Sequence, residues 1–278
     1  MVYTQIITFL VNVFCKEVST MNLIEAIILG LIQGISEFLP VSSSGHLLVF
    51  HHILGITTED NLTFIIVLNM GSLMPLLFVF RKDIILLVKQ PFQKTTALLI
   101  IATVPLVIVT LLFENFIESM FHMVHFLPFG FVITGLVLVL SDKLKKNNRN
   151  MDNINLFDAL LIGLAQAIAI FPGISRSGST ITATMARGVN RESAAKFSFL
   201  ISIPAAIGAL VFRISRIMME PELIEGLNFL NLGVGFITAA LTGYIAINFM
   251  LTIVKKAKLK YFAIYYIFAL VVLIVLFF

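Results

Sequence analysis

One short polar stretch of the chain combines a carboxylate, three hydroxyls and an imidazole. Glu37 follows Gln33 by four residues, so the two side chains share one face of a helix. They are followed by Ser42, Ser43, Ser44 and His46. A serine hydroxyl becomes a nucleophile when a nearby base accepts its proton, and histidine is the most common base. The stretch therefore predicts nucleophilic chemistry with Ser43 or His46 as the attacking group, although serines at such turns also commonly cap helices.

Gln33 and Glu37 have two interpretations. The pair holds a divalent cation or positions a phosphate, or it forms a hydrogen bond that only fixes the helix. A carboxylate that lies far from water is expected to be paired with a cation. We therefore favour the first interpretation and take Glu37 as the candidate metal ligand.

A second polar stretch surrounds Arg176, which lies between Ser175 and Ser177 and is followed closely by Thr180. A planar guanidinium with hydroxyls and helix N-terminal amides around it is suited to bind a phosphate. The alternative is an ion pair between Arg176 and Glu37. The two are compatible, because such a pair can hold the empty site together. The stretch predicts a phosphate or diphosphate site.

The composition indicates the kind of protein in which these residues lie. Apolar residues make up 59% of the 278 residues and charged residues only 12%, whereas soluble globular proteins have about 45–50% and about 25%. A soluble fold cannot keep so much hydrocarbon from water, which indicates a polytopic membrane protein. The single cysteine, Cys15, excludes a disulfide framework and a cysteine-based metal site. No basic tract with interleaved aromatic residues supports nucleic-acid binding.

The apolar residues fall into segments of two kinds. A spanning helix needs about 20 mostly apolar residues, and six segments meet this requirement: 62–80, 95–113, 126–141, 194–212, 230–253 and 260–278. Two further apolar segments, 23–54 and 156–190, are interrupted by Pro40 and Pro172 with neighbouring glycines and serines. Each half is too short to cross alone. We predict two re-entrant helical hairpins, whose turns must be buried in protein or line a watery cavity.

The basic residues are distributed unevenly when these spans are followed along the chain. Fifteen of the nineteen lysines and arginines fall on one side, whereas Lys16, Arg213 and Arg216 fall on the other and Arg176 lies at a hairpin tip. The basic side is expected to be cytoplasmic. The opposite side, expected to face outward, carries Glu114, Glu118, Glu220, Glu222 and Glu225.

An internal repeat relates the two interrupted segments. Nine residues within 26–45 are identical to those 133 positions later, and the tripeptide at 79–81 recurs at 211–213. Each repeat holds one hairpin and three spans, and an odd number of crossings inverts the second repeat relative to the first. The sequence therefore predicts an all-α fold of two inverted repeats, 21–145 and 146–278, whose hairpin tips meet near the membrane midplane.

Other ionisable residues are expected to have structural roles. Glu25 and Asp158 open helices, where the helix dipole favours a negative charge. Arg187 and Arg191 are expected to be cytoplasmic anchors. Four histidines are expected near water-facing helix ends: His51, His52, His122 and His125.

Both polar stretches resemble the signatures of a known family. Gln33-Gly-Ile-Ser-Glu37-Phe-Leu-Pro-Val-Ser-Ser-Ser-Gly-His46 is similar to an (E/Q)-x-x-x-E motif followed by a Ser-Gly-His turn. Pro172-Gly-Ile-Ser-Arg-Ser-Gly-Ser-Thr180 is similar to the second motif of that family. The family is that of the undecaprenyl-diphosphatases of the bacitracin-resistance type. Residues 1–20 lie outside the resemblance as an N-terminal extension, which favours Met21 over Met1 as the start.

The resemblance implies an integral enzyme of the bacterial plasma membrane that hydrolyses undecaprenyl diphosphate to undecaprenyl phosphate and inorganic phosphate. This reaction recycles the lipid carrier for cell-wall polymers and confers bacitracin resistance. The resemblance also implies a divalent cation, Mg²⁺ or Ca²⁺. By position, Glu37 is the essential carboxylate, Ser43 and His46 belong to the catalytic turn, and Arg176 binds the diphosphate. The substrate-binding set is expected to comprise Gln33, Ser42, Ser44, Ser175, Ser177 and Thr180.

One position weakens the expected cation site. Gln33 occupies a place where the family motif has either Glu or Gln, which leaves one anionic ligand fewer. The expected partners are a polyprenyl diphosphate and the membrane, with a homodimer as an open alternative and no nucleic acid.

The rival function is a transporter or lipid flippase for an anionic substrate, because inverted repeats with broken helices also build transporters. A transporter has no need for a hydroxyl, an imidazole, a carboxylate and a guanidinium at one point of the membrane. These four groups therefore favour the enzyme.

Overall fold

The computed structural model of the protein describes residues 21–56, 62–144, 148–219, 228–256 and 259–277. Within these ranges the regular structure is helical, apart from an isolated β-bridge between Arg149 and Val189. The helices are α2 (Leu23–Phe38), α3 (Ser43–Leu54), α4 (Leu62–Val79), α5 (Arg81–Lys89), α6 (Lys94–Leu112), α7 (Glu114–His122), η2 (Val124–Phe126), α8 (Leu127–Ser141), η3 (Met151–Asn153), α9 (Leu156–Ile168), α10 (Arg176–Ala186), α11 (Arg191–Met219), α12 (Phe229–Lys256) and α13 (Lys260–Phe277). The all-α prediction is confirmed for this part of the chain, whereas the 1–20 extension lies outside it.

The long helices identify a membrane protein. Among the described residues α6, α11 and α12 are long and apolar enough to cross a bilayer. A fourth span results if α4 is counted together with α5, from which it is bent by 83°. α8, α9 and residues 260–271 of α13 are shorter apolar helices. The helix bounds lie within three residues of five of the six expected segments, whereas α11 begins three residues before the expected 194–212 and continues seven residues beyond it. That all six cross the membrane stays a prediction.

Two segments that the sequence analysis did not treat as separate helices are helical. The connection at 81–94 contains α5, and α7 precedes α8. α5 is amphipathic: Ile84 and Leu87, three residues apart, pack against the hydrophobic core, whereas Arg81 and Lys82 are exposed. Such surface helices are too short and too charged to appear in a search for spans.

Both interrupted segments form two helices joined by a turn, as predicted. α2 ends at Phe38, and Pro40 lacks the N–H that would continue the helix. In the turn between α9 and α10, Gly173 has a φ of 86°, which glycine adopts without steric cost. α2 has 16 residues and α9 has 13. At about 1.5 Å per residue, neither covers the roughly 30 Å of a bilayer core.

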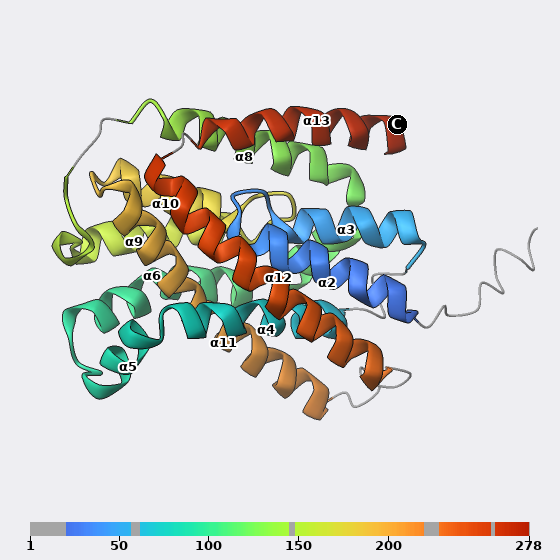
Figure 1. Ribbon diagram of the computed structural model, residues 1–278, viewed down its shortest axis with the longest axis horizontal. Coiled ribbons are helices and arrows are strands. Elements are labelled where there is room, and N and C mark those ends of the chain that lie inside the picture. Colours follow the sequence, from blue (N-terminus) through green and yellow to red (C-terminus); the bar gives the residue numbers. More distant parts are fainter. Residues whose placement is uncertain (1–20, 57–61, 145–147, 220–227, 257–258, 278) are drawn as a thin grey trace, which may run out of the picture.

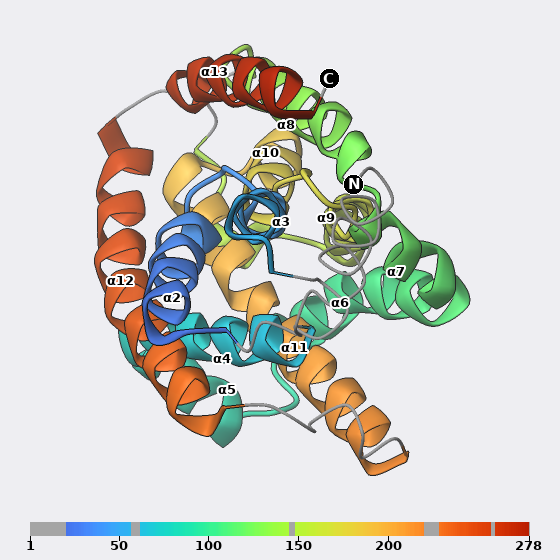
Figure 2. The same cartoon turned by 90° about the vertical axis from the view of Figure 1, so that its right-hand side faces the viewer.

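The two turns lie side by side at the centre of the molecule (Figure 1). The end-on view shows α3, α9 and α10 in the middle, inside a ring formed by α12, α4, α6, α8 and α13 (Figure 2). A hydrogen bond of 2.9 Å from Ser177 Oγ to the carbonyl oxygen of Leu39 joins the turns directly. Segments far apart in the sequence therefore share one central site.

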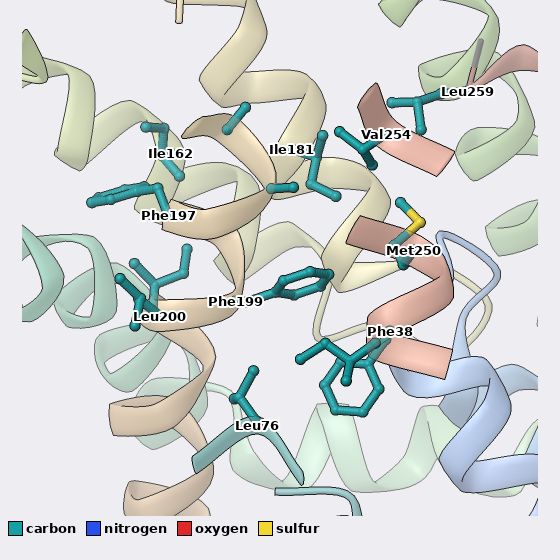
Figure 3. Packing of buried hydrophobic residues seen from close by; sticks show 14 of the residues in the cluster. Phe38, Leu76, Ile162, Ile181, Phe197, Phe199, Leu200, Met250, Val254 and Leu259 are labelled. Atoms are coloured by element: carbon teal, nitrogen blue, oxygen red, sulfur yellow. The ribbon is translucent and has the colours of Figure 1, made fainter. Parts of the chain in front are cut away.

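A hydrophobic cluster fixes the end of α2 beside this site. Phe38 packs with Leu76 of α4, Phe199 of α11 and Met250 of α12 (Figure 3). The rings of Phe38 and Phe199 meet edge to face, with centroids 5.8 Å apart. An edge-to-face ring pair contributes about 0.5–1.5 kcal/mol beyond the area it buries. Because Phe38 follows Glu37, this packing also sets the direction of the Glu37 carboxylate.

Candidate active site

The first turn is built so that Ser43 faces back toward α2. Ser42 has a φ of 58°, the single positive value at a non-glycine residue of the described ranges. This backbone conformation costs on the order of 1–3 kcal/mol and is found preferentially at functional sites. The Ser42 hydroxyl accepts a hydrogen bond of 3.3 Å from the backbone N–H of Gly45 and so caps α3. Ser43 is the first residue of α3, directly after the bend.

The second turn holds Arg176 in the corresponding place at the start of α10. The Ser175 hydroxyl accepts a hydrogen bond of 3.1 Å from the N–H of Gly178 and caps this helix. The Ser175 N–H in turn donates to Thr134 Oγ1 of α8 at 2.9 Å. These two hydrogen bonds fix Ser175, and with it the backbone directly before Arg176.

Both turns direct a side chain to Glu37. Ser43 Oγ donates a hydrogen bond of 2.7 Å to Glu37 Oε2. Arg176 Nη2 forms an ion pair with the other carboxylate oxygen, Oε1. The side chains of Glu37 and Arg176 are 18% and 22% exposed, so the pair is shielded from water but remains reachable. The ion pair weighed in the sequence analysis is present.

Gln33 extends this contact network to α4. Its Nε2 donates to Glu37 Oε2 at 3.0 Å, which is the expected hydrogen bond along the helix. The same nitrogen donates to Asn69 Oδ1 at 2.6 Å and lies 3.3 Å from Ser72 Oγ. Asn69 and Ser72 were not predicted. Their signal in the sequence is a pair of polar side chains one turn apart within an apolar span.

A cavity of ≈ 380 Å³ opens on these residues. Its polar wall is formed by the two turns and Glu37, and its apolar wall by side chains such as Ile66 of α4, Ile117 of α7 and Ile170. Arg176 Nη1 is buried and has no hydrogen-bond partner in the described part of the protein. A second cavity of ≈ 270 Å³ touches the same ion pair from between α4, α6 and α11. The site therefore suits an anionic group attached to hydrocarbon.

His46 is directed away from the carboxylate. Its Nδ1 lies 2.7 Å from the carbonyl oxygen of Ser42, and its ring packs edge-on against Phe131 of α8 at 5.5 Å. His46 lines neither of the two cavities beside Glu37. The geometry therefore favours Ser43 over His46 as the nucleophile, with Glu37 rather than the imidazole as the proton acceptor.

The other expected binding residues divide into two groups. Four of them line the larger cavity: Ser42, Ser44, Ser175 and Ser177. Thr180 lies outside it, because its hydroxyl is buried, donates to the carbonyl oxygen of Arg176 at 2.8 Å and lies 2.5 Å from Ser198 Oγ of α11. The structure thus brings every expected site residue to the cavity except His46 and Thr180.

The capping roles expected of Glu25 and Asp158 are confirmed. Each forms a reciprocal capping box with an asparagine three residues earlier, Asn22 on α2 and Asn155 on α9. Asp158 is fully buried and also accepts a hydrogen bond of 2.7 Å from Arg187 Nε. Both carboxylates therefore fix helix starts rather than take part in chemistry.

The expectation that His51 faces water is wrong. Its side chain is fully buried, and both ring nitrogens have no hydrogen-bond partner in the described part of the chain. His51 lies one helical turn after Leu47 on the buried face of α3, so helix periodicity carries it inward although the helix ends three residues later. His52, the next residue, is exposed as expected.

The residues beside Glu37 fit an oxygen-bound divalent cation. Mg²⁺ is usually held by one or two carboxylates, with waters and substrate phosphates completing its shell. Besides the Glu37 carboxylate, Gln33 Oε1 is a buried oxygen without a hydrogen-bond partner in the described ranges. Three or more His, Cys, Asp or Glu side chains do not cluster anywhere in those ranges. A cation here would therefore depend on substrate oxygens as well as on the protein.

Comparison with known proteins assigns the chain to a family. Residues 26–272 match the family described as "Bacitracin resistance protein BacA". A protein named "Undecaprenyl-diphosphatase" from Carboxydothermus hydrogenoformans is 44% identical over 245 residues, which cover 88% of this chain and 94% of the relative. "Undecaprenyl-diphosphatase 4" from Bacillus thuringiensis (strain Al Hakam) is 41% identical over 92% of this chain and 97% of its own length. An "Undecaprenyl-diphosphatase" from Methanobrevibacter smithii is 38% identical over 88% of this chain and 94% of its own. Matches of this extent, together with the two polar turns, establish that the chain belongs to the BacA family of bacitracin resistance proteins.

Proposed function

We propose that this protein hydrolyses undecaprenyl diphosphate to undecaprenyl phosphate and inorganic phosphate, the activity for which its relatives are named. One observation carries the proposal: the Ser43 hydroxyl and the Arg176 guanidinium converge on the Glu37 carboxylate at the wall of an amphipathic cavity. A nucleophile, a proton acceptor and an anion-binding group are the parts that phosphoryl transfer requires.

In the proposed mechanism the terminal phosphate of the lipid binds to Arg176 Nη1, and the guanidinium shifts from Glu37 to the phosphate. Glu37 then accepts the proton of Ser43, whose oxygen forms a bond to the terminal phosphorus. The bond from that phosphorus to the bridging oxygen breaks, and undecaprenyl phosphate leaves. Water then attacks the phosphoserine, the bond from phosphorus to the serine oxygen breaks, and inorganic phosphate leaves. The serine oxygen regains the proton held by Glu37. Arg176 and the serines of both turns stabilise the charge that develops in each transition state.

The proposed cofactor is a divalent cation, Mg²⁺ or Ca²⁺, which Glu37 would hold. Gln33 would add Oε1 as a ligand once its amide, whose Nε2 faces Glu37, turns over. When bound, the cation supplies positive charge to the phosphate oxygens. The buried and unpartnered Gln33 Oε1 supports this assignment. His46 is a positioning residue in this scheme, because its bond to the Ser42 carbonyl holds the bend that presents Ser43.

We further infer the two inverted repeats, 21–145 and 146–278, with their re-entrant hairpins. The capping boxes that open α2 and α9 support the repeat, since they lie 133 residues apart. So do two close helix contacts: a Cβ at Gly30 would lie 2.7 Å from the Gly235 carbonyl oxygen of α12, and one at Gly163 would lie 2.6 Å from that of Ala102 in α6. Each repeat thus packs its first helix on a span of the other.

The proposed location is the bacterial plasma membrane, where the reaction returns the lipid carrier to wall synthesis. The diphosphate reaches the turns while the polyprenyl chain stays among apolar helices. The cavity between α4, α6 and α11, lined mainly by apolar residues including Leu73, Leu106 and Ala209, supports a lateral route for the chain.

The test is phosphate release by the purified protein in detergent, given undecaprenyl diphosphate and Mg²⁺. We expect release by the wild type, and its loss in Arg176→Ala and Glu37→Ala variants that keep the melting temperature of the wild type. A phosphoserine at Ser43 in an acid-quenched reaction would identify the nucleophile. Release that is unchanged in both variants would overturn the proposal. Binding of the lipid without release would favour the transporter.

A further inference from the structure

Two arginines of α11 line the same cavity as the catalytic groups. Arg213 and Arg216 lie three residues apart, so they share one face of the helix, and both form part of the cavity wall that also contains Glu37 and Arg176. They are also two of the three basic residues that the sequence places on the outer side. A positive charge there runs against the usual distribution in membrane proteins.

The contacts of these arginines leave them within reach of a ligand. Arg216 Nη1 forms an ion pair of 2.8 Å with Glu114 Oε1, and the two side chains are 30% and 32% exposed. Arg213 donates to Thr63 Oγ1 from Nη2 at 2.6 Å and from Nε at 3.2 Å. An ion pair that is about one-third exposed contributes little stability, so an anion with more charge than one carboxylate competes for Arg216 effectively.

The internal repeat offers a comparison. The counterpart of Arg213 is Arg81, since the tripeptide at 79–81 recurs at 211–213. Arg81 is exposed, donates to the carbonyl oxygen of Phe78 and lies over the ring of that residue. It lines neither cavity beside the active site. An arginine at this place in the repeat therefore does not have to line a cavity, because Arg81 lines neither of the two. Arg213, in contrast, lines the larger one.

We propose that Arg213 and Arg216 form a second phosphate-binding site at the outer end of the cavity, separate from Arg176. The inference rests on the proposed function. Guanidinium groups bind phosphate oxygens in pairs of parallel hydrogen bonds. The site binds either the phosphate of the arriving lipid or the inorganic phosphate that leaves. While the cavity holds no phosphate, Glu114 forms the ion pair with Arg216. An arriving phosphate displaces Glu114 from Arg216.

The test uses Arg216→Gln, Arg213→Gln and the double variant, with Arg81→Gln as the matched control from the other repeat. We expect the KM for undecaprenyl diphosphate, the inhibition constant of inorganic phosphate, or both, to rise about fivefold or more in the cavity variants. The rate at saturating substrate should fall by less. Glu114→Gln should act in the opposite direction and lower the same constants, because it releases Arg216. If the ion pair between Arg216 and Glu114 had only a structural role, substitution of either residue would change the KM and the inhibition constant in the same direction.

The two measurements distinguish the source of the phosphate. A change in KM alone assigns the site to the lipid headgroup, and a change in phosphate inhibition alone assigns it to the released product. Constants that stay within twofold of those of Arg81→Gln in all three variants would overturn the proposal, about twofold being the scatter expected for a neutral surface change. Direct binding of inorganic phosphate to the purified protein, measured by calorimetry, keeps the test independent of turnover. Binding that weakens in the double variant supports the site even if the protein releases no phosphate from the lipid.

Discussion

At the scale of single residues, the two oxygens of Glu37 have different partners. Oε2 accepts hydrogen bonds from Ser43 and Gln33, and Oε1 pairs with Arg176. In the proposed mechanism, Arg176 moves from Oε1 of Glu37 to the substrate phosphate, while Oε2 keeps its hydrogen bond to Ser43. The carboxylate oxygen that accepts the Ser43 proton is therefore not the one that Arg176 occupies.

Glu37→Gln tests this role, because the amide keeps the size of the side chain but cannot accept the proton of Ser43. We expect the kcat of phosphate release to fall about 10²- to 10⁴-fold, the usual contribution of a general base. The measurement is steady-state phosphate release by variants with unchanged melting temperature. If Ser43→Ala abolishes release while Glu37→Gln retains most of it, another group accepts the proton.

Gln33→Glu tests the cation site. The substitution adds a second carboxylate beside Glu37, and Mg²⁺ prefers carboxylate oxygen to amide oxygen. We expect the Mg²⁺ concentration for half-maximal phosphate release to fall about tenfold. Titration of activity with Mg²⁺ at fixed lipid measures it, with Asn69→Asp, whose side chain is hydrogen-bonded to Gln33, as a second variant. An unchanged or raised Mg²⁺ requirement in Gln33→Glu would show that Gln33 is not a ligand.

The sequence predicts the residues of this site better than their contacts. The spacing of Gln33 and Glu37 and the hydroxyls around Arg176 mark the two turns. The partner of Ser43 depends on the bend at Ser42. The positive φ of Ser42 cannot be predicted from its residue type. Asn69 joins the site only because α4 packs beside α2, and such tertiary contacts are not encoded in a local pattern.

At the scale of secondary-structure elements, α13 supports the first turn from outside. Tyr266 donates a hydrogen bond of 2.7 Å to the carbonyl oxygen of Pro40. Its ring packs against Phe131 at 5.6 Å, and Phe131 packs in turn against His46. The last helix therefore contacts both the backbone and the side chains that shape the catalytic bend.

Tyr266→Phe should loosen this turn. The substitution keeps the ring but leaves the Pro40 carbonyl oxygen without its donor, which costs about 1–3 kcal/mol for a buried group. We expect a lower melting temperature in detergent and a reduced kcat with little change in KM. Tyr261→Phe, on the exposed part of the same helix, is the control. Equal effects of the two substitutions would mean that the bond to Pro40 does not position the turn.

Gly163→Val tests the close packing of α9 on α6. A Cβ at Gly163 would lie 2.6 Å from the Ala102 carbonyl oxygen. Because this oxygen belongs to the backbone of α6, it cannot move aside as the end of a flexible side chain can. We expect destabilisation of about 1–3 kcal/mol or more, from overpacking and backbone shift, measured as a lower melting temperature. At Gly208 of α11 an added Cβ meets nothing within 4 Å, so Gly208→Ala should leave stability unchanged or raise it slightly. Tolerance of valine at Gly163 would contradict the contact.

At the scale of the whole molecule, hydropathy predicts the long helices and the two interruptions because lipid imposes a length and a composition on each span. It misses α5 and α7, which lie outside that constraint. The shift of 133 residues indicates which helices correspond, and α2 and α9 indeed open with equivalent capping boxes. Which helices become neighbours depends on close approaches such as that of Gly30 to α12, and a sequence pattern does not specify the partner.

Thiol labelling from either side of the membrane tests the inverted topology. In a Cys15→Ser background, Arg81→Cys and Arg213→Cys place single thiols at equivalent positions of the two repeats. An odd number of crossings between them puts these positions on opposite sides. A membrane-impermeant maleimide added to intact cells should therefore label the thiol at 213, which lines the cavity and is expected on the outer side, and should label the thiol at 81 only after permeabilisation. Both positions carry arginine in the recurring tripeptide Val-Phe-Arg. Because Arg81 is the more exposed of the two, burial cannot account for protection of the thiol at 81 in intact cells. Labelling of both thiols in intact cells, or of neither, would contradict the proposed inversion, by which the two turns would reach Glu37 from opposite leaflets.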